Sequence, residues 1–196
     1  MLCRLAIFGI IFCFLQIPGI LGQLVLGPGT WTIVNVQQCE NGEKYPAKMH
    51  IRKFKLNRTH DAFDVDTYFG PDVDETFGIR LVLYKKVDGG FKLFMTLADD
   101  NLPRFCKAHS AKNIKYGLEL AGIDPPDFPV PRGELHIRDF VINVDELAQE
   151  GMYGDFLGYG YIIKDLRDVA CMKVYYKYEP NDDKGPVGQW FKNSKS

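Results

Sequence analysis

Cys106 and His109 are the residues whose types and spacing come closest to a reactive or metal-binding pair. Residues three apart on a helix are neighbours, so the two side chains could form half of a zinc site or a thiol with its base. A zinc site needs two more ligands, and the sequence contains no second close pair. We therefore expect Cys106 to pack as a small apolar residue and His109 to cap or line its helix.

The other candidates for chemistry are a run of acidic residues between Asp64 and Glu75 and a triplet that contains two glycines. The run lacks the spacing with a central glycine that calcium loops need, and its alternation with Phe and Val is typical of the solvated face of a strand. The triplet Gly158-Tyr159-Gly160 is too short for a phosphate loop, and its glycines are expected to ease a bend. No serine lies in a Gly-x-Ser-x-Gly motif, so the sequence predicts no enzyme, metal or cofactor. The acidic residues are Asp64, Asp66, Asp72, Asp74 and Glu75.

The elements that position these residues are mainly strands, because apolar and polar residues alternate along most of the chain. Residues 31–39 and 48–58 are expected as the first two strands, and in 63–69 the apolar and acidic side chains take opposite faces. The clearest pattern is a hairpin with Asp88-Gly89-Gly90 at its turn. One face of its first strand is predicted to carry Phe77, Ile79, Leu81 and Leu83, and one face of its second strand Phe91, Leu93, Met95 and Leu97.

The period changes between Asp100 and Ala121, where apolar residues fall at helical spacing. Asp99 or Asp100 is placed to cap the start of this segment. Pro103 is tolerated in the first turn, and Gly122 is placed to end the segment. Because polar residues interrupt the apolar face, the sequence predicts either one helix or two short ones.

Further strands follow the helix and complete the predicted fold. In 133–144 the apolar positions switch faces, which indicates a β-bulge. Residues 159–165 and 171–179 are expected as the last strands. About eight half-buried strands and one helix predict a mainly β fold, an antiparallel, immunoglobulin-like β-sandwich with one inserted helix. One face of the last strand is predicted to carry Met172, Val174, Tyr176 and Tyr178.

The two ends of the chain differ from its middle. Residues 1–22 are expected to be a cleaved signal peptide, because Arg4 precedes an apolar run with a small-residue exit. The alternative, a membrane-spanning helix, is opposed by the prolines and glycines from Pro18 onward, so we expect a secreted protein with no stable membrane anchor.

Loss of Arg4 leaves 23 basic and 25 acidic side chains, and this near-neutrality argues against nucleic acid as a partner. Residues 23–179 are expected to form one domain, and 180–196 a flexible tail.

The cysteines and one asparagine point to the same extracellular setting. Cys39, Cys106 and Cys171 remain after cleavage, and three thiols in an oxidising compartment imply one disulfide and one free cysteine. Asn57-Arg58-Thr59 is the one Asn-x-Ser/Thr triplet, so Asn57 is expected to carry a glycan.

Phe and Tyr supply most of the inward positions of the predicted strands. Such rings either fill a core completely or line a slot that holds an apolar ligand. The residues alone favour neither outcome.

The order of features resembles an insect family, the secreted CheA/CheB chemosensory-type proteins, which are related to the ganglioside activator protein and the ML (lipid-recognition) group. The features are the leader, the triplet at Asn57, the hairpin, the helix with Cys106 and the stretch Pro-Val-Pro-Arg-Gly-Glu-Leu-His-Ile, 129–137. The chain departs from the family at Phe54 and in 125–129, where relatives carry further cysteines. The resemblance covers roughly Trp31 to Tyr178 and rests on order and spacing more than on any one residue.

The resemblance implies an open, ML-like sandwich that binds without catalysis, and in the chemosensory branch a role in detecting contact pheromones. It also implies a disulfide bond between the first and last strands. This bond would pair Cys39 with Cys171 at the rim, outside the core, and leave Cys106 free. The proline-rich segment 124–134 would then be one rim of the slot, with Phe128 at its entrance.

Together these observations predict a secreted carrier or recognition protein for a lipid or hydrocarbon-like molecule, with an extracellular receptor as a further partner. The alternative is a solid-cored module that recognises another protein through its helix or through Trp190-Phe191. The residues expected to line the slot are Phe77, Leu81, Phe91, Met95, Phe128, Phe140, Ile142, Tyr159, Tyr161 and Tyr176.

Overall fold

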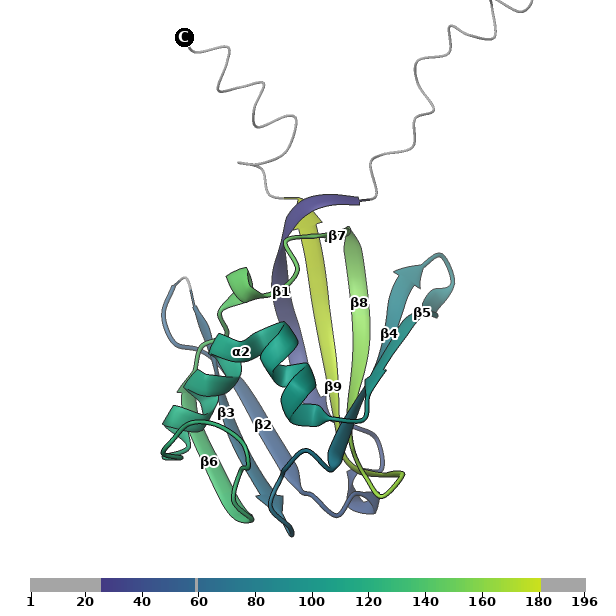
Figure 1. The fold of residues 1–196 in the computed structure, drawn as a ribbon. Coiled ribbons are helices and arrows are strands. Elements are labelled where there is room, and N and C mark those ends of the chain that lie inside the picture. The colour runs from purple at the N-terminus through teal and green to yellow at the C-terminus, as the bar shows by residue number, and fades with distance from the viewer. Residues whose placement is uncertain (1–25, 59, 181–196) are drawn as a thin grey trace, which may run out of the picture.

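The alternating stretches form strands in the computed structural model of the protein, which describes residues 26–58 and 60–180 (Figure 1). In chain order the elements are β1 (Leu26–Gln38), η1 (Gly42–Lys44), β2 (Met49–Lys55), β3 (Asp61–Phe69), β4 (Phe77–Val87), β5 (Gly90–Asp99), α2 (Leu102–Leu120), β6 (Gly133–Phe140), η2 (Val144–Glu146), β7 (Glu150–Met152), β8 (Gly154–Lys164) and β9 (Arg167–Pro180).

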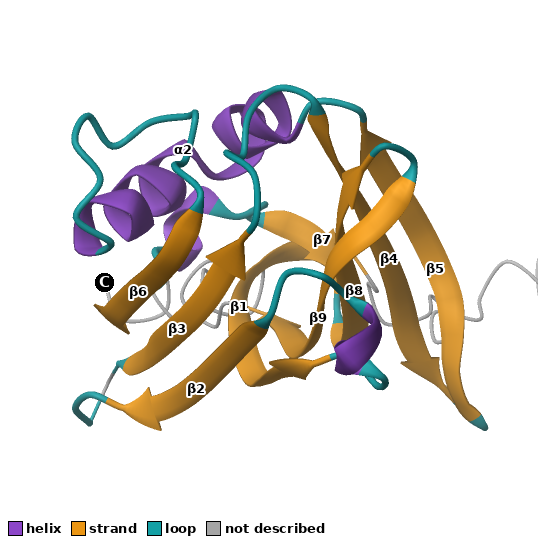
Figure 2. Ribbon diagram, turned by 90° about the horizontal axis from the view of Figure 1, so that it is seen from below, coloured by secondary structure: helices purple, strands orange, loops and turns teal. Residues whose placement is uncertain are grey.

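Hydrogen bonds join these strands into two antiparallel sheets. The six-stranded sheet has the order β5-β4-β8-β9-β1-β7 and curls, and the three-stranded sheet has the order β2-β3-β6 (Figure 2). Helix α2 contacts β6 of the smaller sheet and β4 of the larger one, so it bridges the open side between them. The predicted mainly β fold, an antiparallel β-sandwich with one inserted helix, is confirmed.

The hairpin of β4 and β5 forms at the predicted glycine turn, but the expected face of β5 is wrong. Phe94 is an extra residue in β5, because its neighbours Leu93 and Met95 pair with consecutive residues of β4. Such a β-bulge reverses the alternation of side chains along the strand. Phe91 and Leu93 therefore lie on the opposite face of the sheet from Met95 and Leu97.

The bulge predicted in 133–144 is confirmed in β6. Between the pairs Val65–Ile137 and Phe63–Phe140, β6 carries one more residue than β3. Asp139 within this bulge has a φ of 54°, a left-handed conformation that aspartate adopts more readily than most residues. The apolar side chains of β6 switch faces there, as the sequence pattern indicates.

Helix α2 begins at a different cap from the one predicted. Asn101 is the N-cap residue, and its side-chain oxygen accepts the N–H of Arg104 at 2.8 Å. Asp100 and Asp99 lie one and two positions too early along the chain, and Asp99 instead accepts the N–H of Asn101 at 2.8 Å. Pro103 lies in the first turn, where its missing N–H has no helical partner to lose.

The end and the middle of α2 agree with the sequence pattern. Gly122 follows the last turn with a φ of 74°, the conformation for which glycine has no steric penalty. Ser110 has φ −160° and ψ 40°, so α2 consists of two helical segments joined by a kink. The second of the two predicted forms, two short helices, describes α2 better.

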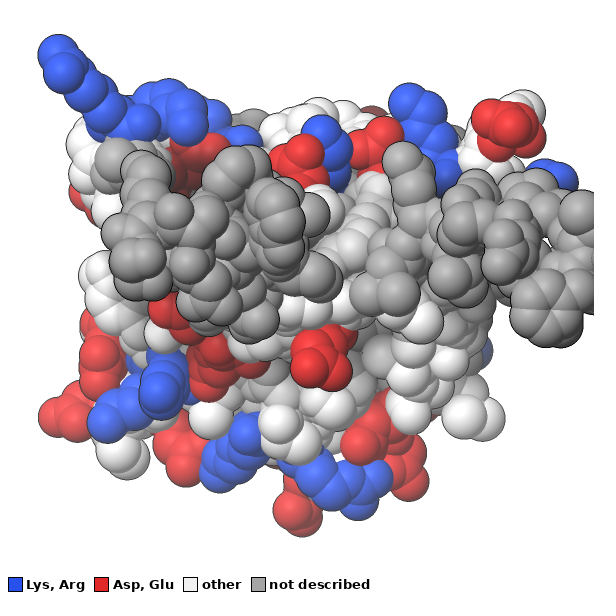
Figure 3. Space-filling view, turned by 90° about the horizontal axis from the view of Figure 1, so that it is seen from above, with Lys and Arg blue, Asp and Glu red and all other residues white. Residues whose placement is uncertain are grey.

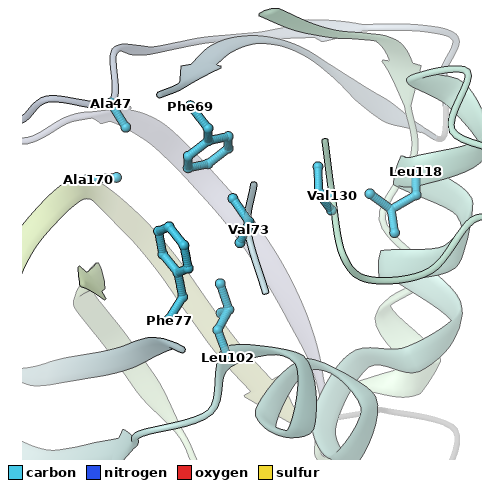
Figure 4. Packing of buried hydrophobic residues seen from close by; sticks show 8 residues of the cluster. All are labelled: Ala47, Phe69, Val73, Phe77, Leu102, Leu118, Val130 and Ala170. Atoms are coloured by element: carbon cyan, nitrogen blue, oxygen red, sulfur yellow. The ribbon is translucent and has the colours of Figure 1, made fainter. Parts of the chain in front are cut away.

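The core lies between the two sheets, α2 and the loops that enter β4 and β6, and its side chains point toward one another (Figure 4). The proline-rich segment closes one side of this core. Val130 and Val73 exchange two main-chain hydrogen bonds of 2.8 and 2.9 Å, and Phe128 packs against the cluster. The segment is therefore part of this fold. The buried members of the cluster are Ala47, Phe69, Val73, Phe77, Leu102, Leu118, Val130 and Ala170.

The chain ends bear on two predictions. The expected signal peptide and residues 181–196 lie outside the described residues. Strand β9 continues to Pro180, so the domain extends one residue past the predicted boundary at 179. Within 26–58 and 60–180, no helix has both the length and the apolar character needed to cross a membrane.

Candidate functional site

An apolar hollow of about 330 Å³ lies on the inner face of the six-stranded sheet. The strand pairings put Leu81, Leu83 and Tyr176 on the same face as the buried Phe77. The core cluster covers this face at Phe77 and ends before Leu83 and Tyr176, so the face stays open there. The hollow is lined by Trp31, Ile33, Leu81, Leu83, Leu147, Ala148, Gly158, Tyr159, Gly160, Met172, Val174 and Tyr176.

Gly158 and Gly160 make the hollow possible because they put no side chain on this face of β8. A Cβ atom added at Gly158 would lie only 3.2 Å from Leu83 Cδ2, and one added at Gly160 would lie 3.4 Å from Leu81 Cδ2. The main chain of β8 therefore forms the floor, and this explains why Tyr159, between the two glycines, belongs to the lining.

Trp31 and Tyr176 form an aromatic wall of the hollow, with ring centroids 5.2 Å apart. Phe156 stacks on Tyr176 at 5.4 Å with an interplanar angle of 6°. The indole N–H of Trp31 donates to the carbonyl oxygen of Ala148 at 2.7 Å, which ties the wall to the loop before β7. Burial raises the pKa of Tyr176 to about 12, so its hydroxyl keeps its proton at physiological pH.

A second pocket, also of about 330 Å³, adjoins the hollow because Trp31 and Ile33 line both. Its polarity is mixed, and it opens between β1 and the smaller sheet. Its other lining residues are Thr30, Thr32, His60, Asp61, Phe63, Val141, Ile142 and Val144.

The structure brings four of the ten predicted slot residues to the hollow or its adjoining pocket. Leu81 and Tyr176 line the hollow with their side chains and Tyr159 with its main chain, and Ile142 lines the adjoining pocket. Met95 pairs with Leu83 and so continues the hollow's face onto the edge strand.

The other five predicted residues lie elsewhere, so the single slot is corrected to a smaller one. Phe77 and Phe128 belong to the core cluster, because α2 and the proline-rich segment pack there. The bulge in β5 turns Phe91 outward, and Tyr161 points outward because it alternates with Gly160. Phe140 lies under α2, against the ring of Tyr116 at 5.7 Å.

Sequence reasoning missed Trp31, Ile33, Leu83 and the two glycines as parts of the site. The Gly-x-Gly spacing was a usable signal, because two glycines two apart on a strand leave one face bare. The contribution of Trp31 and Ile33 had no local signal, since it depends on β1 pairing with β9.

Cys39 and Cys171 form a disulfide, with their Cα atoms 5.6 Å apart. Both cysteines are buried, and neither belongs to the core cluster. The segment that follows β1 is fastened to β9 beside the bridge. Glu40 forms an ion pair with Lys173, and the N–H of Ala47 donates to the carbonyl oxygen of Val169 at 2.9 Å.

Cys106 is the free cysteine of the described residues and packs against the core cluster. The ring of His109 packs against that of Phe105, with centroids 4.5 Å apart and an interplanar angle of 44°. Burial raises the pKa of the Cys106 thiol to about 11, so the thiol is protonated at neutral pH. A protonated thiol is a poor nucleophile and a poor metal ligand.

The Cys106 thiol is expected to react with iodoacetamide at pH 8 about 100-fold more slowly in the folded protein than in the denatured chain, because its pKa rises from 9.0 to about 11. The rate should rise about tenfold for each pH unit up to that value. Mass spectrometry of the quenched reaction measures the rate, and the denatured, non-reduced protein is the control. Equal rates in the folded and denatured protein would contradict the buried position of Cys106.

The acidic residues in β3 form ion pairs on the outer face of the smaller sheet. Asp64 accepts from Arg52 Nη2 at 2.5 Å, and Asp66 accepts from His136 Nδ1 at 2.6 Å and Arg138 Nη2 at 2.5 Å. Hydrogen bonds from these side chains hold the pKa of both carboxyls below its usual range. In the part of the chain that the structure describes, no group of His, Cys, Asp or Glu is arranged to hold a metal ion.

The surface carries charges of both signs and an exposed glycosylation candidate. On the face that Figure 3 shows, Lys and Arg are interspersed with Asp and Glu and are not gathered by sign. Asn57 is exposed in the turn between β2 and β3, where a glycan would meet no core residue. Glycosylation of Asn57 stays a prediction.

No protein-family model matches the chain, and no curated protein matches it either. The resemblance to the insect chemosensory family and the ML group therefore stays a prediction.

Proposed function

We propose that the protein is a secreted, non-enzymatic carrier that binds an apolar ligand in the hollow on the inner face of its six-stranded sheet. The observation that supports this most directly is the lining itself, which consists of apolar and aromatic side chains over a glycine floor. Apolar surface left open to water costs free energy, and an apolar ligand that covers it recovers that cost. The buried disulfide fits an oxidising, extracellular setting.

The size of the hollow limits the ligand. Its volume of about 330 Å³ is at the small end of the range for ligand pockets. At about 30 Å³ for each group the size of a water molecule, it holds roughly ten non-hydrogen atoms. A medium-length hydrocarbon chain, or one segment of a longer lipid, fits this volume, and a contact pheromone would belong to the same chemical class.

Edge strand β5 favours a second candidate, a protein-interaction module. Its outer edge has no strand partner among the described residues, and its large apolar side chains are between 36% and 63% exposed. An exposed, apolar edge strand can add a strand from a partner protein, such as an extracellular receptor. The side chains are Phe91, Leu93, Phe94, Met95 and Leu97.

Native mass spectrometry of the protein from a secretory host is expected to show one bound small molecule, which organic extraction removes. Because the chain has two tryptophans, a Trp190→Phe variant reports on Trp31 at the hollow alone. Adding n-decane to the extracted variant should shift the Trp31 fluorescence.

Protein that is always empty, with Trp31 fluorescence unchanged by n-decane, would contradict the carrier function. The matched variant is Leu93→Lys, on the edge strand away from the hollow. It should leave n-decane binding intact, whereas it should abolish binding to a partner protein if β5 is the functional surface.

A further inference from the structure

The polar groups of the aromatic cluster beside the hollow are almost all used within the protein. The indole N–H of Trp31 donates to Ala148 at 2.7 Å. The hydroxyl of Tyr178, which packs behind Trp31, donates to the carbonyl oxygens of Gln149 at 2.7 Å and Gly27 at 3.1 Å. Neither group is available to a ligand in the hollow.

The hydroxyl of Tyr176 differs, because it has no hydrogen-bond partner among residues 26–58 and 60–180 and is not fully enclosed by them. Its ring is fixed between Phe156 and Trp31, so the hydroxyl has little freedom to move. The hydroxyl lies 3.7 Å from the position that a Cβ atom at Gly158 would occupy. It therefore projects over the glycine floor, into the hollow.

The hollow is open, so water solvates this hydroxyl in the empty protein. A ligand that fills the hollow displaces that water, and the lining side chains offer little in its place, because they are apolar apart from the used indole N–H and the tyrosine hydroxyls. A polar group that loses its hydration without a new partner costs free energy. An acceptor on the ligand restores the lost hydrogen bond, whereas a plain hydrocarbon does not.

The lining also determines which charge a bound ligand can carry. None of its twelve residues is Lys, Arg, His, Asp or Glu. A carboxylate placed here would lose its hydration without gaining a counter-ion, which is strongly unfavourable. The acceptor that Tyr176 meets is therefore uncharged, such as the oxygen of a ketone or an ester.

We propose that Tyr176 determines the specificity of the hollow by donating a hydrogen bond to one uncharged carbonyl oxygen on an otherwise apolar chain. This inference rests on the proposed carrier function. It names the ligand class as medium-chain ketones or esters, in preference to plain hydrocarbons and to fatty acids.

The test compares 2-nonanone, n-decane and octanoate, which have about ten non-hydrogen atoms each and so fill the hollow equally. Their affinities are measured by Trp31 fluorescence in the extracted full chain carrying Trp190→Phe. We expect 2-nonanone to bind about fivefold to tenfold more tightly than n-decane, and octanoate to bind most weakly. Tyr176→Phe should remove the preference for 2-nonanone, so that 2-nonanone and n-decane bind the variant with similar affinity. The variant loses no internal hydrogen bond, so it should remain folded.

Tyr178→Phe is the control, because its hydroxyl bonds to the main chain outside the hollow. It should keep the preference for 2-nonanone. Two outcomes would show that Tyr176 does not determine specificity. Either Tyr176→Phe keeps the preference for 2-nonanone, or n-decane and 2-nonanone bind the protein with Tyr176 equally. In both cases the carrier function stands. If none of the three compounds binds, the carrier function and this inference both fall.

Discussion

Replacing Gly160 with leucine is expected to lower the affinity for n-decane about 200-fold. The Cβ atom fits, since its nearest neighbour would be Leu81 Cδ2 at 3.4 Å, and the rest of the side chain must enter the hollow. Leucine adds four non-hydrogen atoms, which displace about as many methylene groups of the ligand. At about 0.8 kcal/mol for each buried methylene, the loss is about 3 kcal/mol. Titration of the extracted protein with n-decane, followed by Trp31 fluorescence, measures it.

The same substitution at Gly70 is the control, because a side chain there meets no atom within 4 Å. Gly70→Leu should bind n-decane as the unsubstituted protein does. Gly160→Leu should unfold at the same denaturant concentration or a higher one, since glycine in a strand interior is unfavourable and the new side chain is buried. Retained binding by a folded Gly160→Leu protein would place the ligand elsewhere.

Removing the disulfide with the double substitution Cys39→Ala and Cys171→Ala is expected to lower the free energy of unfolding by about 5 kcal/mol. The bridge closes a loop with a sequence separation of 132 residues. In the chain-entropy model, a loop of this length restricts the unfolded chain by about that amount. Equilibrium unfolding in urea, with the midpoint and slope compared with those of the unsubstituted protein, measures the change.

Cys106→Ala is the matched control, because it removes a thiol that forms no bridge. It should cost only about 1 kcal/mol, the contribution of one partly buried apolar group. A double variant as stable as this control would show that the Cys39–Cys171 bridge does not constrain the unfolded chain. Mass spectrometry of the intact protein confirms which cysteines are oxidised.

Much of the fold could be predicted from short stretches of sequence. The hairpin of β4 and β5 follows from two alternating runs around a glycine turn, and the bulge in β6 follows from apolar positions that change parity. The end of α2 at Gly122 follows from the change of period and from glycine's conformational freedom. These features depend on residues that are close along the chain, so the local pattern contains them.

The bulge at Phe94 shows where local pattern fails. Apolar residues recur at every second position of β5 from Phe91 to Leu97, and Phe94 departs from this pattern as a further apolar residue between Leu93 and Met95. A run of three apolar residues does not by itself show that a strand carries an extra residue. The bulge becomes visible only in the pairing with β4, and it moves Phe91 from the hollow's face to the outer face. A one-residue shift has this effect because side chains alternate with a period of two.

The sequence by itself determined a mainly β fold with one helix and the apolar face of β4. It also contains the Gly-x-Gly spacing, whose consequence for the face of β8 was not predicted. The tertiary structure decided which part of the apolar face is core and which part is open. Phe77 and Leu81 share one face of β4, yet Phe77 is buried by the core cluster and Leu81 lines the hollow. The physical reason is the reach of α2 and the proline-rich segment, which cover one end of the face and not the other. That coverage depends on contacts between residues far apart in the chain, and no local pattern records it.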